Sequence, residues 1–311
     1  MEAVNDAEKQ ADGELFKTFE ELGYKPTDKE VQELKKAVRK IANVRLRVGI
    51  FGQTGMGKSS LCNALFGAEI SKVGHGVSMT RKVNEADVDL GNGAGITLLD
   101  FPGLGEDEDR DVEYKKLYRE EMPAVDLVLW LLAVNDRKNK DDVAAYKEIV
   151  LPIAKEHGLP VIFVANKADA AHPKNWSAES NSPSAEQHET IKAAVYGSLD
   201  EEGTHSKGFV QKFEIKDEQI CIVSADMGYG LVGLVETIVR FLPDHKKFGF
   251  VREAKKETVS PKAEVEAKEG FFESVKKEVM KVIREHGPKV VAAASKMLVT
   301  IAIGWLTKKK F

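Results

Sequence analysis

One stretch of the sequence combines glycines, a lysine and hydroxyl side chains at a spacing that suits phosphate binding. Residues 52–59, GQTGMGKS, match the pattern G-x-x-x-x-G-K-S/T and lie between an apolar run and an amphipathic segment. The glycines let backbone N–H groups close around phosphate oxygens at the start of a helix. We expect Lys58 to bridge the β- and γ-phosphates and Ser59 to bind Mg²⁺. The predicted phosphate-binding residues are Gly52, Gln53, Thr54, Gly55, Met56, Gly57, Lys58, Ser59 and Ser60.

A carboxylate follows at the end of the next apolar run. Residues 100–103, DFPG, close the run ITLLDF and match D-x-x-G, a signature of proteins that hydrolyse GTP. Asp100 can hold Mg²⁺ through a water molecule, and the Gly103 N–H can contact a γ-phosphate oxygen. An Asp before Pro-Gly is by itself more often a turn former. Its position one strand after a phosphate loop favours the metal-site interpretation.

The third motif predicts which base is bound. Residues 166–169, NKAD, follow the apolar run VIFVAN. The Asp169 carboxylate can accept paired hydrogen bonds from the N1–H and the exocyclic amino group of guanine, whereas adenine offers no such pair. Leaving a buried carboxylate unpaired costs a few kcal/mol, which corresponds to orders of magnitude in selectivity. We expect Lys167 to lie along the ring system and Asn166 to tie this loop to the phosphate loop.

Two weaker signals complete the predicted site. Ser224 and Ala225 end the run ICIVSA and resemble the last motif of GTP-binding domains, whose backbone approaches the guanine carbonyl oxygen. The first switch is expected in residues 72–81, KVGHGVSMTR, where Thr80 would complete the Mg²⁺ shell and sense the γ-phosphate. Ser78 is the main competitor, and an ordinary loop threonine is the alternative. The residues expected to act in hydrolysis are Lys58, Thr80 and Gly103.

The elements that must position these residues follow from the hydrophobic pattern. Apolar runs alternate with longer amphipathic segments, which favours a mostly parallel sheet covered by helices. The predicted strands are residues 45–51, 83–90, 96–101, 126–134, 161–166 and 220–225. Helices are expected after the phosphate loop, from about residue 184, near 229–241, and at 28–42 before the first strand. The predicted fold class is α/β, with a six-stranded, mostly parallel sheet flanked by helices.

The composition argues against some partners and compartments. The 311 residues include 46 basic and 50 acidic side chains, a net charge of -4, so no overall positive field attracts DNA or RNA. Cys62 and Cys221 lie in separate apolar patterns and are expected to be reduced thiols. The N-terminus, MEAVNDAEKQADGELF, is acidic and lacks a signal-peptide pattern, which predicts a cytoplasmic protein.

The last part of the chain is basic and amphipathic. Apolar residues recur at three- and four-residue spacing over 270–286, which predicts a helix. The apolar segment 290–305 contains Lys296 and is shorter than the roughly 20 residues needed to span a bilayer. Residues 271–311 hold nine Lys or Arg and three Glu, a net charge of +6. This region is predicted either to pack on the main domain or to contact a partner protein or an anionic membrane surface, peripheral to the inner membrane face.

These motifs and their surroundings resemble the Era and TrmE group of translation-factor-class GTPases. The resemblance is carried by FGQTGMGKSSLCNALFG at 51–67, DFPGLG at 100–105, NKAD and the Ser-Ala pair. DRDVEYKKLYR at 109–119 and DLVLWL at 126–131 are similar to YfjP-type bacterial GTPases. The resemblance covers about residues 44–245 and implies a G domain that binds GTP or GDP with Mg²⁺ and hydrolyses GTP.

Two positions depart from related GTPases. Leu104 follows Gly103, where many small GTPases have a water-orienting glutamine, and Gly55 stands where potassium-activated relatives have an asparagine. We therefore expect no potassium activation and a slow intrinsic turnover of about 10⁻⁴ to 10⁻² s⁻¹. Acceleration would need a partner or a homodimer formed through the switch regions. Arg81 and Arg110 lie in or beside the switches, although exposed arginines usually have no catalytic role.

Four regions are predicted along the chain. They are an N-terminal helical extension at 1–43, a G domain at 44–245, a charged linker at 246–269 and a C-terminal amphipathic helical region at 270–311. The leading hypothesis is a guanine-nucleotide switch that controls a partner. One alternative is a self-assembling, membrane-associated GTPase of the dynamin-like or immunity-related type that uses the tail. The other is a GTPase of ribosome or RNA maturation.

Overall fold

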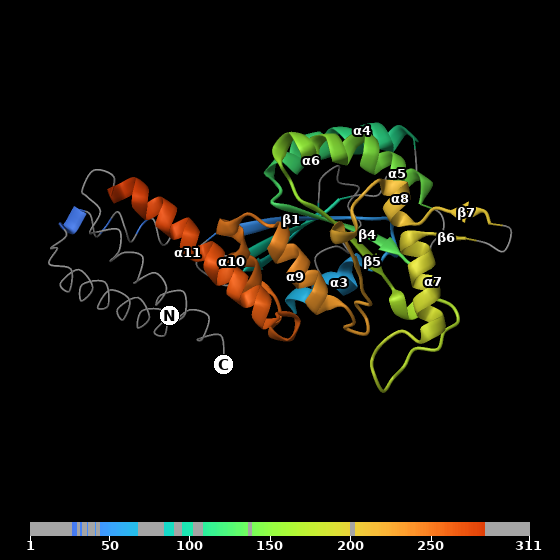
Figure 1. Ribbon diagram of the computed structural model, residues 1–311. Coiled ribbons are helices and arrows are strands. Elements are labelled where there is room, and N and C mark those ends of the chain that lie inside the picture. Colours follow the sequence, from blue (N-terminus) through green and yellow to red (C-terminus); the bar gives the residue numbers. More distant parts are fainter. Residues whose placement is uncertain are drawn as a thin grey trace.

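A central sheet organises the part of the chain that the computed structural model describes (Figure 1). The described residues are 44–67, 84–89, 95–101, 108–135, 139–199 and 203–283, with 27–29, 32, 36 and 41. The strands are β1 (Arg45–Phe51), β2 (Asn84–Asp89), β3 (Gly95–Asp100), β4 (Leu127–Ala133), β5 (Val161–Asn166) and β8 (Ile220–Ile222). They lie in the order β2-β3-β1-β4-β5-β8, in which β2 is antiparallel to β3 and the other pairs are parallel. The predicted six-stranded, mostly parallel α/β fold is confirmed.

Helices cover both faces of this sheet. Helices α3 (Lys58–Phe66) and α9 (Leu231–Phe241) lie on one face, while α4 (Glu108–Glu121) and α6 (Leu151–His157) lie on the other (Figure 1). The reason is the apolar character of the central strands: every residue of β4 is buried. Because such strands carry apolar side chains on both faces, helices cover each face and shield it from water. Two hydrophobic cores result, one on each side of the sheet.

The remaining described elements are shorter or lie late in the chain. They are η2 (Met122–Ala124), α5 (Lys140–Ala145), the π-helical η3 (Tyr146–Val150), η4 (Ala168–Ala170), α7 (Ala185–Tyr196), β6 (Ser198–Leu199), β7 (His205–Ser206), α8 (Phe209–Phe213), η5 (Asp217–Gln219), α10 (Asp244–Glu253), η6 (Lys256–Thr258) and α11 (Pro261–Ile283). Strands β6 and β7 pair with each other in a separate two-stranded sheet.

Some boundaries differ from the predicted ones. Strand β8 ends at Ile222 rather than at residue 225, because Ser224 pairs across a turn with Tyr229 in an isolated bridge. The helix expected from about residue 184 is α7, and a capping box between Ser184 and Gln187 fixes its start. The helix predicted at 28–42 lies largely outside the described residues.

The segment after α9 is helical and packed. The charged composition of residues 246–269 predicts a partly helical linker, and α10 and the first part of α11 occupy these positions. Phe250, Ala263 and Ala267 are buried in the same core as β1, α3 and α9. The apolar residues of α11 recur every four residues, and this spacing outweighs the average composition. The boundary between a G domain and a helical extension stays a prediction.

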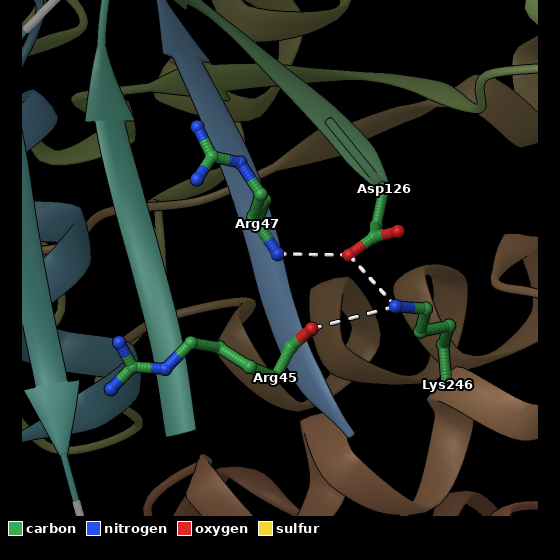
Figure 2. A network of polar contacts seen from close by, with 4 residues as sticks. All are labelled: Arg45, Arg47, Asp126 and Lys246. Atoms are coloured by element: carbon green, nitrogen blue, oxygen red, sulfur yellow. Dashed lines mark hydrogen bonds and ion pairs between the residues drawn. The ribbon is translucent and has the colours of Figure 1, made fainter. Parts of the chain in front are cut away.

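Two contacts fix α10 to the start of the sheet and to α3. The Asp126 carboxylate accepts hydrogen bonds from the Arg47 backbone N–H at 2.9 Å and from Lys246 Nζ at 3.2 Å (Figure 2). Just beyond α10, the Lys255 N–H donates to the Leu65 carbonyl in the last turn of α3 at 2.7 Å. The C-terminal helices are therefore joined to the first strand and to the helix that follows the phosphate loop.

None of the helices in the described ranges is both long enough and apolar enough to cross a bilayer. The predicted membrane-surface segment at 290–305 lies outside these ranges, as do residues 284–286, the end of the helix predicted at 270–286. The cytoplasmic location stays a prediction from the sequence.

Candidate nucleotide-binding site

The phosphate-loop motif connects the end of β1 to the start of α3. Gly57 is the N-cap residue of α3, and its φ of 90° lies in the region that favours glycine. A Cβ at this position would also collide with the Asn166 side-chain amide. The first N–H groups of a helix have no partner inside the helix and carry its positive end. The loop therefore offers the backbone donors that phosphate oxygens require.

Lys58 brings the first two motifs together. Its Nζ donates to the Gly52 carbonyl at 2.8 Å and to the Gln53 carbonyl at 3.4 Å. The same Nζ lies 3.7 Å from Asp100 Oδ1, and the lysine side chain is 18% exposed. A mostly enclosed ammonium group thus lies between the phosphate loop and the carboxylate that ends β3, where it can attract a polyphosphate.

Ser59 and Asp100 offer oxygen ligands of the kind that Mg²⁺ prefers. Ser59 is exposed, and the Asp100 side chain is 51% exposed. Oxygens that are open to solvent fit a cation that usually keeps several waters and adds phosphate oxygens. Partial burial raises the pKa of Asp100 above its usual value, although the Lys58 ammonium acts in the opposite direction. In the described ranges, no group of three His, Cys, Asp or Glu side chains could hold a metal.

Asn166 connects three motifs. The side chain is buried, and its Nδ2 donates to the Met56 carbonyl of the phosphate loop at 2.9 Å. Its Oδ1 accepts from the Ala225 N–H at 3.1 Å. The expected tie between Asn166 and the phosphate loop is present, and the same amide also fixes the loop after β8.

Asp169 and Ser224, the residues predicted to lie near the base, are in contact with each other. The Ser224 hydroxyl donates to Asp169 Oδ1 and accepts from the Met227 N–H at 3.2 Å. Ser224 is fully buried, and its backbone pairs with that of Tyr229. Lys167, which lies between Asn166 and Asp169 in the motif, adopts a positive φ of 62°. The hydrogen bond from Ser224 therefore orients one carboxylate oxygen of Asp169.

Sequence reasoning missed a set of contacts beyond the NKAD motif. Asn181 Nδ2 donates to the Met227 carbonyl at 2.9 Å, and Trp176 Nε1 donates to Asn181 Oδ1 at 3.2 Å. The Trp176 and Tyr229 rings meet edge to face at 5.4 Å. Gln187, at the start of α7, donates to the Asp169 and Ala171 carbonyls at 3.3 and 3.0 Å. The S-x-x-Q pattern at the helix start was the one available signal.

Several predicted site residues lie outside the described ranges. They are Thr80 and its competitor Ser78, Gly103, Leu104 and Arg81. Arg110 belongs to α4, but its side chain is not described. The switch segments and the residues assigned to hydrolysis, apart from Lys58, therefore stay predictions.

The comparisons with known proteins agree with this arrangement. The family model described as 50S ribosome-binding GTPase matches residues 47–167. The uncharacterized protein YkfA of Escherichia coli (strain K12) is 32% identical over 212 residues, which are 68% of this chain and 67% of YkfA. The chain belongs to the 50S ribosome-binding GTPase family. Members of a GTPase family bind GTP and hydrolyse it, so this GTPase is a GTP hydrolase by family.

Other relatives of this GTPase are matched over less of their length. YfjP of Escherichia coli (strain K12) is 33% identical over 63% of this chain and 62% of its own. GTPase Era of Aquifex aeolicus (strain VF5) is 27% identical over 63% of this chain and 56% of its own. A crystal structure of Era in complex with MgGDPNP and 16S ribosomal RNA has 25% identity and a TM-score of 0.42, over 64% of this chain and 57% of Era. The GTPase thus spans less than two thirds of YfjP and Era.

Proposed function

We propose that this GTPase is a guanine-nucleotide switch that controls a partner and hydrolyses GTP slowly. The observation that carries the proposal is the Asn166 side chain, which joins the phosphate loop at Met56 to the loop that begins at Ala225. Phosphate recognition and base recognition are thereby held in one unit. A nucleotide that bridges both ends would be bound in a single defined orientation.

Base selection in this proposal depends on Asp169. Ser224 engages one of its carboxylate oxygens, which leaves the group oriented to accept from a base. The N1–H and the 2-amino group of guanine form the matching pair of donors. Adenine lacks that pair, so the Asp169 carboxylate would receive no hydrogen bond from the base, at a cost of about 1 to 3 kcal/mol.

At the phosphate end, Lys58 and the N–H groups at the start of α3 would bind the β- and γ-phosphates. Ser59 directly, and Asp100 through water, would hold Mg²⁺, with Thr80 as a further proposed ligand. Bound Mg²⁺ would neutralise charge on the phosphate oxygens. During hydrolysis, water attacks the γ-phosphorus, the bond to the β–γ bridging oxygen breaks, and GDP and phosphate form as the water proton passes to phosphate oxygen or solvent. Lys58 and the Gly103 N–H would stabilise the developing charge.

Slow turnover follows from the residue after Gly103. Leu104 cannot orient the attacking water by a hydrogen bond, so we propose an intrinsic rate of about 10⁻⁴ to 10⁻² s⁻¹. A partner, or a second copy of the chain bound through the switch regions, would then set the time spent in the GTP-bound state. A phosphate-release assay at increasing protein concentration tests this, and a turnover above 1 s⁻¹ without any partner would contradict it.

Replacing Asp169 by asparagine tests the base assignment. Asp169→Asn should lower GDP affinity by about 100-fold, because an amide cannot accept both guanine donors. The same variant should gain affinity for xanthosine diphosphate, whose 2-oxo group can accept from the amide. Fluorescent-nucleotide titration measures both affinities.

Asp226→Asn is the matched control, because Asp226 is an exposed carboxylate two residues beyond Ser224. Its GDP affinity should equal that of the wild type. Equal affinity of the wild type for GDP and ADP would overturn the proposed base assignment.

A further inference from the structure

Gln187 is a buried polar side chain with two different sets of partners. It is fully buried in the first turn of α7. Its Oε1 accepts from the Ser184 N–H at 3.2 Å, and its own N–H donates to Ser184 Oγ at 3.2 Å. These reciprocal bonds form the capping box that starts the helix.

The other end of the Gln187 amide reaches the NKAD motif. Nε2 donates to the Ala171 carbonyl at 3.0 Å and to the Asp169 carbonyl at 3.3 Å. The orientation of the amide is determined by its partners, since a backbone N–H must face oxygen and two carbonyls must face nitrogen. One side chain therefore fixes the start of α7 and the backbone of the residue proposed to read the base.

The backbone at Asp169 has few regular restraints of its own. It lies in η4, a single turn of three residues, held at its start by the Ala168 N–H to Val223 carbonyl bond at 3.1 Å. Paired hydrogen bonds to a base tolerate displacements of only about 0.5 Å. Ser224 restrains the Asp169 carboxylate, and Gln187 restrains the main chain of the same residue.

We propose that Gln187 is a positioning residue for guanine recognition, which holds the Asp169 backbone so that the carboxylate meets both base donors. This inference rests on the proposed function of Asp169. The capping role uses Oε1, whereas the positioning role uses Nε2. Substitutions can therefore separate the two roles.

Inosine diphosphate provides the readout, because its base keeps the N1–H and lacks the 2-amino group. The ratio of GDP affinity to inosine diphosphate affinity reports whether the second hydrogen bond to Asp169 is well made. Gln187→Met removes the donors, and Gln187→Glu keeps an acceptor for the cap while removing the amide N–H. Both should lower the ratio by about three- to tenfold at pH 8.

Lowering the pH distinguishes the two variants. A buried carboxyl that faces carbonyl oxygens has a raised pKa, and once protonated it regains an O–H donor. At pH 5.5 the ratio for Gln187→Glu should return toward the wild-type ratio at that pH, and the ratio for Gln187→Met should stay low. Simple loss of stability would not produce this difference.

Ser184→Ala is the matched control. It removes the hydroxyl that accepts from the Gln187 N–H, and it leaves the Gln187 side-chain amide and its two carbonyl partners intact. Its GDP to inosine diphosphate ratio should equal that of the wild type, even if its thermal unfolding midpoint falls.

The outcomes are distinct. The positioning role is overturned if either folded Gln187 variant keeps the wild-type ratio of GDP to inosine diphosphate affinity at pH 8. It is also overturned if that ratio falls equally in Ser184→Ala. A wild-type protein that binds GDP and ADP equally well overturns the proposed function of Asp169 itself. A reduced ratio in the Gln187 variants, with recovery on protonation in Gln187→Glu alone, establishes the inference.

Discussion

Asn166 shows how much one buried amide can organise. Its two polar atoms are used on two different loops, one on either side of the site, at 2.9 and 3.1 Å. An amide is suited to this task because it offers a donor and an acceptor on one rigid group, whereas a carboxylate offers acceptors alone. Gly57 leaves the space that the amide occupies.

Asn166→Ala is therefore expected to reduce GDP affinity by about 10- to 100-fold. Both loops would lose a buried partner, and the distance between the phosphate and base subsites would no longer be fixed. Isothermal titration calorimetry with GDP measures the change. Asn175→Ala is the control, since Asn175 is exposed and bonds to Glu186. An affinity loss of the same size in both variants would show that Asn166 has no particular role.

The motif residues could be predicted because each motif is contiguous in the sequence. Lys58 and Asp169 are recognised by their neighbours along the chain, and their position after buried strands is itself a sequence pattern. Gln187 lies 18 residues after Asp169, and the contact depends on how α7 folds back on the loop. No local pattern encodes that fold-back, so the capping function was the part that the sequence could indicate.

At the scale of elements, the contact between α10 and α11 decides how the C-terminal region behaves. Lys247 of α10 donates to Glu266 of α11 at 2.9 Å and lies 3.3 Å from Asp244. Burial lowers the pKa of Lys247, but the bonds to Glu266 and Asp244 outweigh it and raise the pKa overall. The composition predicts a partly helical linker here, but a count of charges cannot show that Lys247 and Glu266 pair between two helices.

Glu266→Gln should lower the free energy of unfolding by about 1 kcal/mol at neutral pH. A raised lysine pKa contributes stability that is complete below the unfolded pKa of 10.5 and is lost as the pH rises through the folded pKa. The difference in the free energy of unfolding between Glu266→Gln and the wild type should therefore shrink as the pH rises above 10.5. Urea unfolding at several pH values measures it.

Glu264→Gln is the matched control for this ion pair. Glu264 bonds to Lys268 on the same helix, one turn away, so it joins no other element. Glu264→Gln should lower the free energy of unfolding by less than half as much as Glu266→Gln does. Equal costs would mean that the pair between α10 and α11 adds nothing beyond helix stability.

At the scale of the whole molecule, the C-terminal helices are expected to unfold together with the sheet. Phe271 is 1% exposed and meets the Phe248 ring at 4.7 Å, while Ala263 and Ala267 of the same helix lie in the core shared with β1. Phe271→Ala should destabilise the protein by about 3 kcal/mol. Val265→Ala, at a side chain that is 52% exposed on the same helix, should cost little.

Tryptophan fluorescence can show whether Phe271→Ala also destabilises the sheet. The chain has three tryptophans, and Trp130 lies on β4, buried in the core on the opposite face. In a protein that keeps Trp130 alone, Phe271→Ala should shift the Trp130 unfolding transition by the same amount as the helical signal. An unshifted Trp130 transition would show that the C-terminal helices form an independent unit.

The bond between Leu65 and Lys255 has a consequence for biosynthesis. The two residues are separated by 190 positions, which the ribosome adds in about 10 to 40 s. During that interval α3 and the phosphate loop exist without the helices that cover Leu46 and Leu65. The nascent N-terminal half therefore exposes apolar surface until α10 has been synthesised, and it is in this window that a chaperone would find a binding site.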